Sequence, residues 1–553
     1  LVAGFFVALG RRLGWRTGIT YWSTIAGVLI YSLISGLSPP VIRSAVMAGL
    51  GLYALLFNQR RSWPVALGLA GIVTTINRPE VILEPGYQLS FAATWAILTL
   101  TKDLTHLLRN IPRGPLWLGT GIAVPLAAQL GTWPLLAYHF NQFAPWSLLA
   151  NLLLVEVAGL MLLLGLFMAI LALVSYQAAA ILQWGLGLLT SLFIGSANWL
   201  AGLPGGVISL PSPPLWSIVS YYLLLLMAGT SQGRFLLQRS WKLWLFHRPN
   251  ARPVLLTSAG LAGVLLLVII TGSYREPGLQ VTFLDVGEGD SIFIRTPGGR
   301  SLLIDAGPVQ LNREGKVIYD AGARAVLPFL RSQGVNHLDL VIISHLHRDH
   351  VGGLPEVVQH IKVDNLLLPP LTGDSPEEKS IRRLALTNQI KLLQGQEGQR
   401  VNLDQAVELS ILGPWEELIS PAQAEADREQ RLNNQSLVLQ LAYGKHNYLF
   451  TGDIDSAVLE KLADNKKLGR LTLLKLPHHG SGYSLSTSFL EVTRPELGVI
   501  SVGPNYYGHP SSKVLRYFQD TGIPLLRTDK QGALHISDFG GELKVITFNS
   551  PEG

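Results

Sequence analysis

The first half of the chain consists of long apolar runs separated by short polar loops. A helix that crosses a bilayer needs roughly 20 mostly apolar residues. The runs therefore predict a polytopic α-helical membrane domain with about ten spans, and the shorter ones are typical of half-helices that line a cavity. The predicted spans are residues 1–9, 18–36, 40–57, 62–77, 88–101, 116–138, 145–173, 177–200, 214–230 and 253–272.

The pattern changes at Gln280 to short apolar strands that alternate with polar loops. Residues 281–297 predict two strands joined by a glycine-containing loop, residues 338–344 predict a buried strand, and residues 325–335 predict a helix. Such a mixture is typical of a soluble α/β domain. We therefore expect a membrane domain, a basic interfacial segment with the last span, and a separate C-terminal domain, over residues 1–230, 231–273 and 274–553.

Charge follows the same division. Residues 1–272 carry 15 Lys and Arg and four acids, whereas the rest of the chain carries 28 Lys and Arg and 33 acids. Alternate loops hold thirteen Lys or Arg against one, an asymmetry that marks the richer loops as cytoplasmic. Segment 231–252 has five basic residues and no acid, and its Trp241 and Trp244 suit a membrane interface. The next span then leads outward, which predicts a C-terminal domain outside the cytoplasm.

Five polar or charged side chains lie in or near the predicted spans. Such residues are costly in a membrane and often mark a transport path. Each one alone could equally cap a helix or extend to the interface, but their grouping with small and helix-breaking residues favours a polar cavity. The candidates for lining this channel are Arg43, Gln88, Gln129, Asn151 and Glu156.

The strongest chemical signal is the segment SHLHRDHVGG at 344–353, which directly follows a predicted buried strand. The chain has no cysteine, so a metal would have to be held by His, Asp or Glu, and such ligands suit zinc, manganese or iron. Three later predicted strands also end in metal-competent side chains. The candidates in order are His345, His347, Asp349, His350, Asp453, His478, His479 and His509.

Three membrane segments resemble the core of the ComEC competence family: SPPVIRSAVMAGL (38–50), EPGYQLSFAATWAIL (84–98) and PLAAQLGTWPLLAYHFNQFAPWSLLANLL (125–153). In the second half, His-x-His-x-Asp-His followed by Thr-Gly-Asp and a late histidine resembles the metallo-β-lactamase fold. The forms Asp-Val-Gly-Glu-Gly-Asp-Ser, His-His-Gly-Ser and Tyr-Gly-His-Pro resemble the C-terminal domain of the same family. This resemblance implies an αβ/βα sandwich with its metals at one edge of the two sheets.

The resemblance also implies a function in natural transformation. It implies a multi-pass channel that moves single-stranded DNA across the bacterial cytoplasmic (inner) membrane, with an outer domain that hydrolyses DNA phosphodiesters. Because the chain has no nucleotide-binding motif, energy is expected from a cytoplasmic helicase; a DNA-receptor protein and a homodimer are further expected partners. The family usually carries earlier spans and a small β-barrel domain, and the chain opens inside an apolar run, so we expect an N-terminally truncated sequence.

The family's site residues carry over by position. The resemblance assigns His345 and His347 to a first divalent metal, zinc or manganese, and Asp349 and His350 to a second one. It makes Asp453 the bridging carboxylate and His478 a late ligand, with His479 or His509 next in line. It also implies catalytic roles for Asp349, which would orient a water, and for His479 or His509, which would donate a proton to the leaving group.

The match is incomplete at the first metal. Ordinary members of the fold supply one more histidine before the Gly-Asp, and here that interval offers His360, Asn433 and Asn434, besides His446 inside a predicted hairpin. The first metal site is therefore expected to be weak or empty. Lys475 is expected to be a solvated surface lysine, and His446 a turn residue.

Two other interpretations stay open. One is a membrane-anchored metallohydrolase that acts on a substrate other than DNA, although about ten spans exceed what an anchor needs. The other is a channel whose hydrolase-like domain has lost activity and only binds DNA. The incomplete first metal site keeps this last interpretation open.

Overall fold

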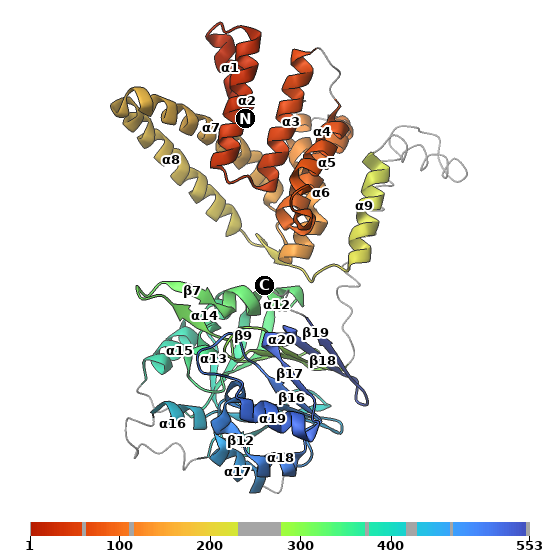
Figure 1. Ribbon diagram of the computed structural model, residues 1–553, viewed down its shortest axis with the longest axis vertical. Helices are drawn as coiled ribbons and strands as arrows, with labels where there is room; N and C mark the ends of the chain where they lie inside the picture. Colours follow the sequence, from red (N-terminus) through yellow and green to blue (C-terminus); the bar gives the residue numbers. More distant parts are fainter. Residues whose placement is uncertain are drawn as a thin grey trace, which may run out of the picture. The chain divides into compact units, whose positions relative to one another are not determined.

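The computed structural model describes residues 2–57, 62–109, 116–229, 278–370, 375–415, 428–464 and 468–548. The chain divides into two compact units, Leu1–Ser273 and Tyr274–Gly553 (Figure 1). The predicted basic segment 231–252 and the predicted span 253–272 lie outside the described residues.

The N-terminal unit is helical in its described part. Each predicted span from 1–9 to 214–230 overlaps a helix. The helices are α1 (Val2–Arg12), α2 (Thr17–Ile34), α3 (Pro39–Leu56), α4 (Trp63–Thr75), α5 (Pro85–Arg109), α6 (Leu116–Phe140), α7 (Ser147–Val174), α8 (Tyr176–Ala201) and α9 (Leu215–Gly229), with a 3₁₀ turn η1 (Pro79–Leu83) and a short pair of strands, β1 (Gln142–Phe143) and β2 (Ile208–Ser209).

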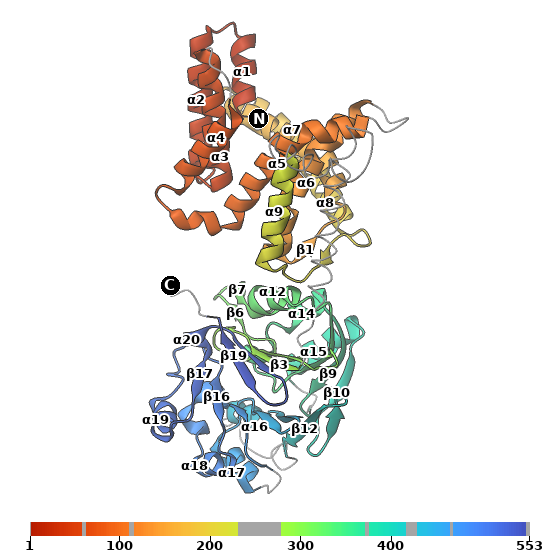
Figure 2. The ribbon, with the colours of Figure 1, turned by 90° about the vertical axis from the view of Figure 1, so that its right-hand side faces the viewer.

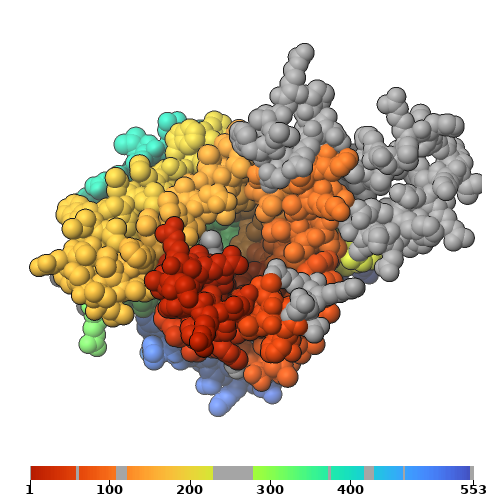
Figure 3. Space-filling model, turned by 90° about the horizontal axis from the view of Figure 1, so that it is seen from above, coloured from red at the N-terminus to blue at the C-terminus, as the bar shows by residue number. Residues whose placement is uncertain are grey.

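Four of these helices, α2, α3, α7 and α8, are long and apolar enough to cross a membrane. The α7–α8 hairpin leaves its large apolar side chains uncovered, and Leu173, Ile181 and Trp184 are 75–87% exposed. Apolar surface of this extent would be unusual on a protein surrounded by water but suits contact with lipid. Figure 3 shows the same unit hollowed between α1–α2 in red, α5–α6 in orange and α7–α8 in yellow.

Helices α5, α6 and α9 share a buried apolar cluster that includes Ala96, Ala127 and Tyr221. Gly131 allows α6 to approach α5, because a Cβ at this position would lie 2.5 Å from the Cβ of Ala96. Pro134 has no N–H, so the Leu130 carbonyl one turn earlier loses its usual helical partner. The hydroxyl of Tyr221 on α9 donates to that carbonyl at 2.7 Å, and Tyr222 donates to the Gly131 carbonyl at 2.7 Å. Two backbone carbonyls next to Pro134 thus have partners inside the helical unit.

The C-terminal unit is a sandwich of two twisted sheets (Figure 2). The first has eight strands in the order β10-β9-β8-β5-β4-β3-β18-β19, and the second has seven in the order β11 to β17. The strands of the first sheet are β3 (Leu279–Phe283), β4 (Ile292–Arg295), β5 (Ser301–Ile304), β8 (His337–Ile342), β9 (Lys362–Leu368), β10 (Lys391–Gln394), β18 (Leu534–Asp538) and β19 (Leu543–Thr547).

The strands of the second sheet are β11 (Arg400–Asn402), β12 (Val407–Gly413), β13 (Val438–Tyr443), β14 (His446–Phe450), β15 (Leu473–Lys475), β16 (Leu497–Ile500) and β17 (Leu525–Arg527). A separate hairpin is formed by β6 (Val309–Leu311) and β7 (Val317–Asp320). The helices are α12 (Leu327–Ser332), α13 (Arg348–Val351), α14 (Leu354–His360), α15 (Pro376–Thr387), α16 (Arg428–Asn434), α17 (Ser456–Asp464), α18 (Thr487–Thr493), α19 (Ser512–Thr521) and α20 (Thr528–Gln531), with short turns η2 (Gly322–Val326), η5 (His478–Gly480) and η6 (Gly482–Ser484).

Three apolar clusters hold the sandwich together. The first lies between the sheets and includes Phe283 and Phe450. The second fills the space between the first sheet and helices α12, α14 and α15, and the third lies between the second sheet and α17 to α19. Helices therefore cover both outer faces, which confirms the predicted αβ/βα sandwich.

Strand direction determines where the polar side chains gather. Strands β3, β5 and β8 run the same way in the first sheet, and β14, β15 and β16 are parallel in the second. The loops after their carboxyl ends meet at one edge of the sandwich. This edge receives the predicted metal-binding segments from both sheets.

Candidate metal centre

The loop after β8 is fixed by a buried carboxylate at the end of β5. Asp305, with φ of 58°, accepts hydrogen bonds from the Ser344 N–H and hydroxyl, each at 2.7 Å. It also accepts one from Nδ1 of His350 at 2.9 Å. Because Nδ1 carries this hydrogen bond, Nε2 of His350 is the nitrogen left for a ligand.

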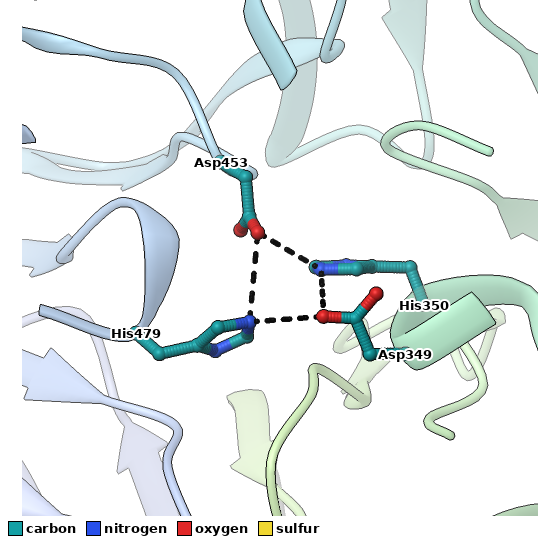
Figure 4. A group of neighbouring side chains, drawn as sticks. All are labelled: Asp349, His350, Asp453 and His479. Carbon is teal, nitrogen blue, oxygen red and sulfur yellow. Dashed lines mark ion pairs between the residues drawn. The ribbon is translucent and has the colours of Figure 1, made fainter. Parts of the chain in front are cut away.

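Four side chains from three loops converge at the edge of the sandwich: Asp349, His350, Asp453 and His479 (Figure 4). Nε2 of His350 lies 3.3 Å from Oδ2 of Asp453 and 3.7 Å from Oδ2 of Asp349. Nε2 of His479 lies 3.5 Å and 3.4 Å from the same two oxygens. We call this set the four-residue centre.

The other nitrogen of His479 donates to the backbone carbonyl of Ser501 at 2.9 Å. This bond turns Nε2 toward the two carboxylates. His478 and His479 both have left-handed backbones, with φ of 49° and 52°. Such conformations are unfavourable for residues other than glycine and concentrate at functional sites. On the Asp453 loop, the same conformation falls on Gly452 (φ 55°), where a Cβ would meet Ser436 at 2.6 Å.

The residues of the centre fit a divalent metal ion. Buried Nε2 atoms of His350 and His479 and buried Oδ1 of Asp453 have no hydrogen-bond partner in the described part of the chain. Buried polar atoms normally find partners, and the two Nε2 atoms both face Oδ2 of Asp453. A tetrahedral ion with bonds of about 2.0–2.1 Å keeps its ligand atoms about 3.3–3.4 Å apart, close to the spacing observed here. The donors are imidazole and carboxylate, which divalent transition metals accept readily.

The pKa shifts of the four side chains also agree with a metal site. Burial alone would lower the pKa of His350, but the charges of Asp453, Asp349 and Asp305 raise it well above its usual value. Burial opposes protonation of His479 too, yet Asp453 and Asp349 raise its pKa to about 9. Burial would raise the pKa of Asp349 and Asp453, but the two imidazoles lower it instead. Without a metal, two imidazolium groups therefore balance these carboxylates.

The structure does not bring His345 and His347 into the four-residue centre. Nε2 of His345 and Nδ1 of His347 lie 3.1 Å apart, and His345 Nε2 is 4.0 Å from Oδ2 of Asp453. Burial and then the charge of His350 lower the pKa of His345 well below its usual value. His345 is thus a neutral ring that packs beside His350, with ring centroids 4.1 Å apart.

His478 and His509 lie next to the centre and outside it. Their rings are 5.3 Å apart, and the ring of His509 is 6.4 Å from that of His479. Nδ1 of His509 bonds to Oε1 of Glu288 at 3.2 Å, and the other oxygen of Glu288 accepts from the Gly503 N–H. Glu288 thus orients His509, while His479 rather than His478 faces the two carboxylates.

The sequence analysis gave no role to two aspartates that lie beside the four-residue centre. Asp290 and Asp305 form a second potential metal-ligand cluster with His350. Asp305 follows an apolar strand, the same signal that indicated Asp453, whereas Asp290 lies in a glycine-rich loop whose course a strand pattern does not predict.

The expectation of a solvated Lys475 was wrong, because its side chain is 1% exposed and pairs with Asp290. His446 is not a simple turn residue either, since it begins β14 and bonds to the buried Asp538 at 2.7 Å.

The candidate channel residues are only partly brought together. Arg43 on α3 donates to the Ser90 carbonyl and the Thr94 hydroxyl on α5. Gln88 on α5 contacts His139 on α6 at 2.8 Å, and the buried Oε1 of Gln129 has no hydrogen-bond partner among the described residues. Asn151 and Glu156 lie on α7, where no hydrogen bond or ion pair within the described ranges connects them to the other three. Glu156 is exposed.

Comparison with known proteins identifies two regions. Residues 1–235 match the model of the Competence protein family, and residues 284–388 match the Metallo-beta-lactamase superfamily. The chain is 27% identical to ComE operon protein 3 of Bacillus subtilis (strain 168) over 521 residues, which are 91% of this chain and 62% of that protein. It is 28% identical to Competence protein ComA of Neisseria gonorrhoeae, over 94% of this chain and 65% of that protein.

A third relative is Recombination protein 2 of Haemophilus influenzae, which is 24% identical over 95% of this chain and 64% of that protein. The chain thus spans less than two thirds of the length of these three relatives. Among solved structures, the metallo-β-lactamase fold protein YhfI of Bacillus subtilis matches 45% of this chain and 95% of its own, with 13% identity and a TM-score of 0.29. Both family matches agree with the division of the chain into a helical unit and a sandwich.

Proposed function

The chain belongs to the ComEC family of competence proteins, and on that premise we propose that it forms a DNA-uptake channel with a DNA-cutting outer domain. The helical unit would move single-stranded DNA across the inner membrane, and the C-terminal domain would hydrolyse phosphodiesters of the strand that is not imported. The observation that carries this proposal is the four-residue centre on a chain whose first 235 residues match a competence domain.

The proposed hydrolysis assigns the metal to Asp349, His350, Asp453 and His479. A bound divalent ion, zinc or manganese, supplies a Lewis acid that activates water and stabilises the leaving oxygen. Asp349 is 34% exposed, whereas the other three side chains are at most 2% exposed. Asp349 is therefore the member that would face incoming substrate, and its second oxygen would orient the attacking water.

His509 is the proposed proton donor to the leaving oxygen. Its Nδ1 is held by Glu288, so Nε2 is the nitrogen available for proton transfer. Its side chain is 12% exposed, within reach of a substrate at the edge of the sandwich. The ring lies beside His479, so a phosphate bound at the centre would lie close to it.

Features of the helical unit support the channel. The α7–α8 hairpin exposes apolar side chains, as expected of a lipid-facing surface, while Arg43 points at polar groups of α5. A guanidinium in a membrane is stable only when backbone or side-chain oxygens surround it. The hollow visible in Figure 3 is consistent with a path between the helices. The excess of Lys and Arg in alternate loops supports an outer location for the C-terminal domain.

The test is DNA cleavage by the full chain purified in detergent. The protein is supplied with manganese or zinc and given single- and double-stranded DNA, beside the variants Asp349→Asn and Asp364→Asn. Asp364 is a partly exposed aspartate that pairs with His337 and Lys362 and serves as the matched control. We expect metal-dependent cleavage in the parent and the control and its loss in Asp349→Asn.

Two outcomes would contradict the nuclease. Bound metal without cleavage of any DNA would leave a DNA-binding domain that has lost activity. Cleavage of simple phosphate or carboxylic esters with no cleavage of DNA would favour a membrane-anchored hydrolase with another substrate. Cleavage that persists unchanged in Asp349→Asn would place the chemistry elsewhere.

A further inference from the structure

A lysine is buried beside the four-residue centre. Lys475 is the last residue of β15, and its side chain is 1% exposed. Its ammonium nitrogen is in close contact with Oδ2 of Asp290, lies 3.7 Å from Oδ1 of Asp453, and donates to the Gly452 carbonyl at 3.2 Å. A buried ammonium is costly unless it is paired and hydrogen-bonded, and these three contacts are all with oxygen atoms near the four-residue centre.

The two carboxylate oxygens of Asp453 have different neighbours, and the ammonium is close to one of them. Oδ2 lies within 3.5 Å of the Nε2 atoms of His350 and His479, on the side of the four-residue centre. Oδ1 points to Lys475. A second metal ion bound to Oδ1 would lie next to a buried ammonium, where like charges repel strongly because little water screens them.

The two histidines that the resemblance assigns to the first metal, His345 and His347, are not placed to bind an additional ion. Among the described residues, the clusters that could hold a metal include neither His345 nor His347. These two rings are directed at each other, with nitrogen atoms 3.1 Å apart. On the segment that leads into β13, where ordinary members of the fold carry a histidine, Ser436 accepts a hydrogen bond from the Asp453 N–H. A serine hydroxyl in this role is a poor substitute for an imidazole ligand.

From these contacts we propose that the centre holds one divalent metal ion, at Asp349, His350, Asp453 and His479, and that the Lys475 ammonium replaces a second one. Lys475 is a positioning residue: it is too deeply buried to touch a substrate, and it holds Asp453 so that Oδ2 faces the metal. This inference rests on the proposed metal centre, but its test uses no DNA. A failure of DNA cleavage therefore leaves it standing.

The experiment measures metal content and affinity of the full chain in detergent. The protein is stripped with a chelator, equilibrated with zinc or, separately, manganese, and desalted, and bound metal per chain is determined by plasma mass spectrometry. The parent is expected to hold one ion. His479→Ala is expected to hold none, whereas His347→Ala is expected to keep one, because His347 lies outside the four-residue centre.

Substitutions of Lys475 test the ammonium directly. Lys475→Ala frees the carboxylates of Asp290 and Asp453, and we expect its metal content to rise above one and approach two. Lys475→Arg keeps the charge and is expected to stay at one, as is the matched control Lys513→Ala, which removes an exposed lysine. Circular dichroism shows whether each variant is folded.

Three results would overturn the proposal. Two ions per chain in the parent, with one lost in His347→Ala, would show a two-metal centre. A metal content of one in folded Lys475→Ala would show that the ammonium does not exclude a second ion. If Lys475→Ala fails to fold, the parent, His347→Ala and Lys475→Arg still decide between one ion and two. No bound metal in the parent would overturn this inference and the proposed metal centre together.

Discussion

Nδ1 of His350 lies 2.9 Å from Oδ2 of Asp305, and neither side chain is more than 1% exposed. This contact fixes which nitrogen of His350 faces the metal centre, although Asp305 itself is not among the four converging residues. The same carboxylate receives both hydrogen bonds from Ser344, so it also holds the backbone of the loop that carries the ligands.

Asp305→Asn should weaken metal binding without removing any proposed ligand. An amide cannot accept from the Ser344 N–H, the Ser344 hydroxyl and His350 at once, so the imidazole loses its fixed orientation. The loss of such an outer partner typically costs about 10–100-fold in metal affinity. Competition with a zinc-binding dye measures this change, with Asp364→Asn as the control. Equal affinity in the two variants would contradict the role of Asp305.

The stability of the metal-free C-terminal unit should fall as the pH rises. The pKa of His479 is raised to about 9 in the folded state, and that of His350 is also well above the usual value of about 6.5. A raised pKa contributes stability that is fully present below about pH 6.5 and is lost as the pH passes through about 9. For His479 the free energy of unfolding should decrease by on the order of 3 kcal/mol.

Urea unfolding of residues 274–553 in chelator at pH 6.5 and pH 9.5 measures that decrease. The three core clusters of this unit are formed by its own residues, so it can be studied alone. Saturating zinc should cancel the decrease, because a metal binds the deprotonated imidazoles and binds more tightly at higher pH. A metal-free unit whose stability is the same or greater at pH 9.5 would contradict the protonated pair His350 and His479.

His509→Gln should slow cleavage and leave metal binding intact. Loss of a general acid typically lowers kcat by about 10²–10⁴-fold, and His509 is not one of the four converging residues. The matched control is His360→Gln, which removes a half-exposed histidine at the end of α14. Metal content and single-turnover cleavage rates are measured on the same samples. A parallel loss of metal and rate would instead make His509 a ligand.

Arg43→Gln should impair DNA uptake by weakening the contact between α3 and α5. The Ser90 carbonyl and the Thr94 hydroxyl would lose a charged donor, a kind of hydrogen bond worth about 1.5–3 kcal/mol. Transformation frequency in cells that carry the variant gives the measurement, with Arg78→Gln as the control because the ion pairs of Arg78 with Glu80 and Glu84 are exposed. Normal uptake with normal protein levels would contradict a role for Arg43 in the channel.

Sequence patterns located helices and strands better than they located side-chain directions. Apolar runs predicted where the membrane helices lie, but they carry no information on which helix contacts which, so the partners of Arg43 were not foreseen. The consecutive His478 and His479 both have left-handed backbones, and a strand pattern does not predict which ring turns inward from such a turn.

The burial of Lys475 had a signal that was overlooked. The run LTLLKLP at 471–477 is apolar on both sides of the lysine, as in a strand covered on both faces. The structure places β15 inside the second sheet, between β14 and β16, with Leu473 in the layer between the sheets and Leu474 under the outer helices. A lysine at the end of such a strand has no path to solvent and must find its partners inside.

The four-residue centre draws two members from the loop after β8 and two from loops of the other sheet, and 102 residues separate His350 from Asp453 along the chain. Half of the centre is therefore present in a ribosome-bound chain that has been made as far as residue 400, and the other half does not yet exist. Two ligands bind a metal ion much more weakly than four converging ligands do. Metal loading at the proposed centre would therefore be a late event in the biogenesis of the protein, completed only after the whole sandwich has been synthesised and has folded.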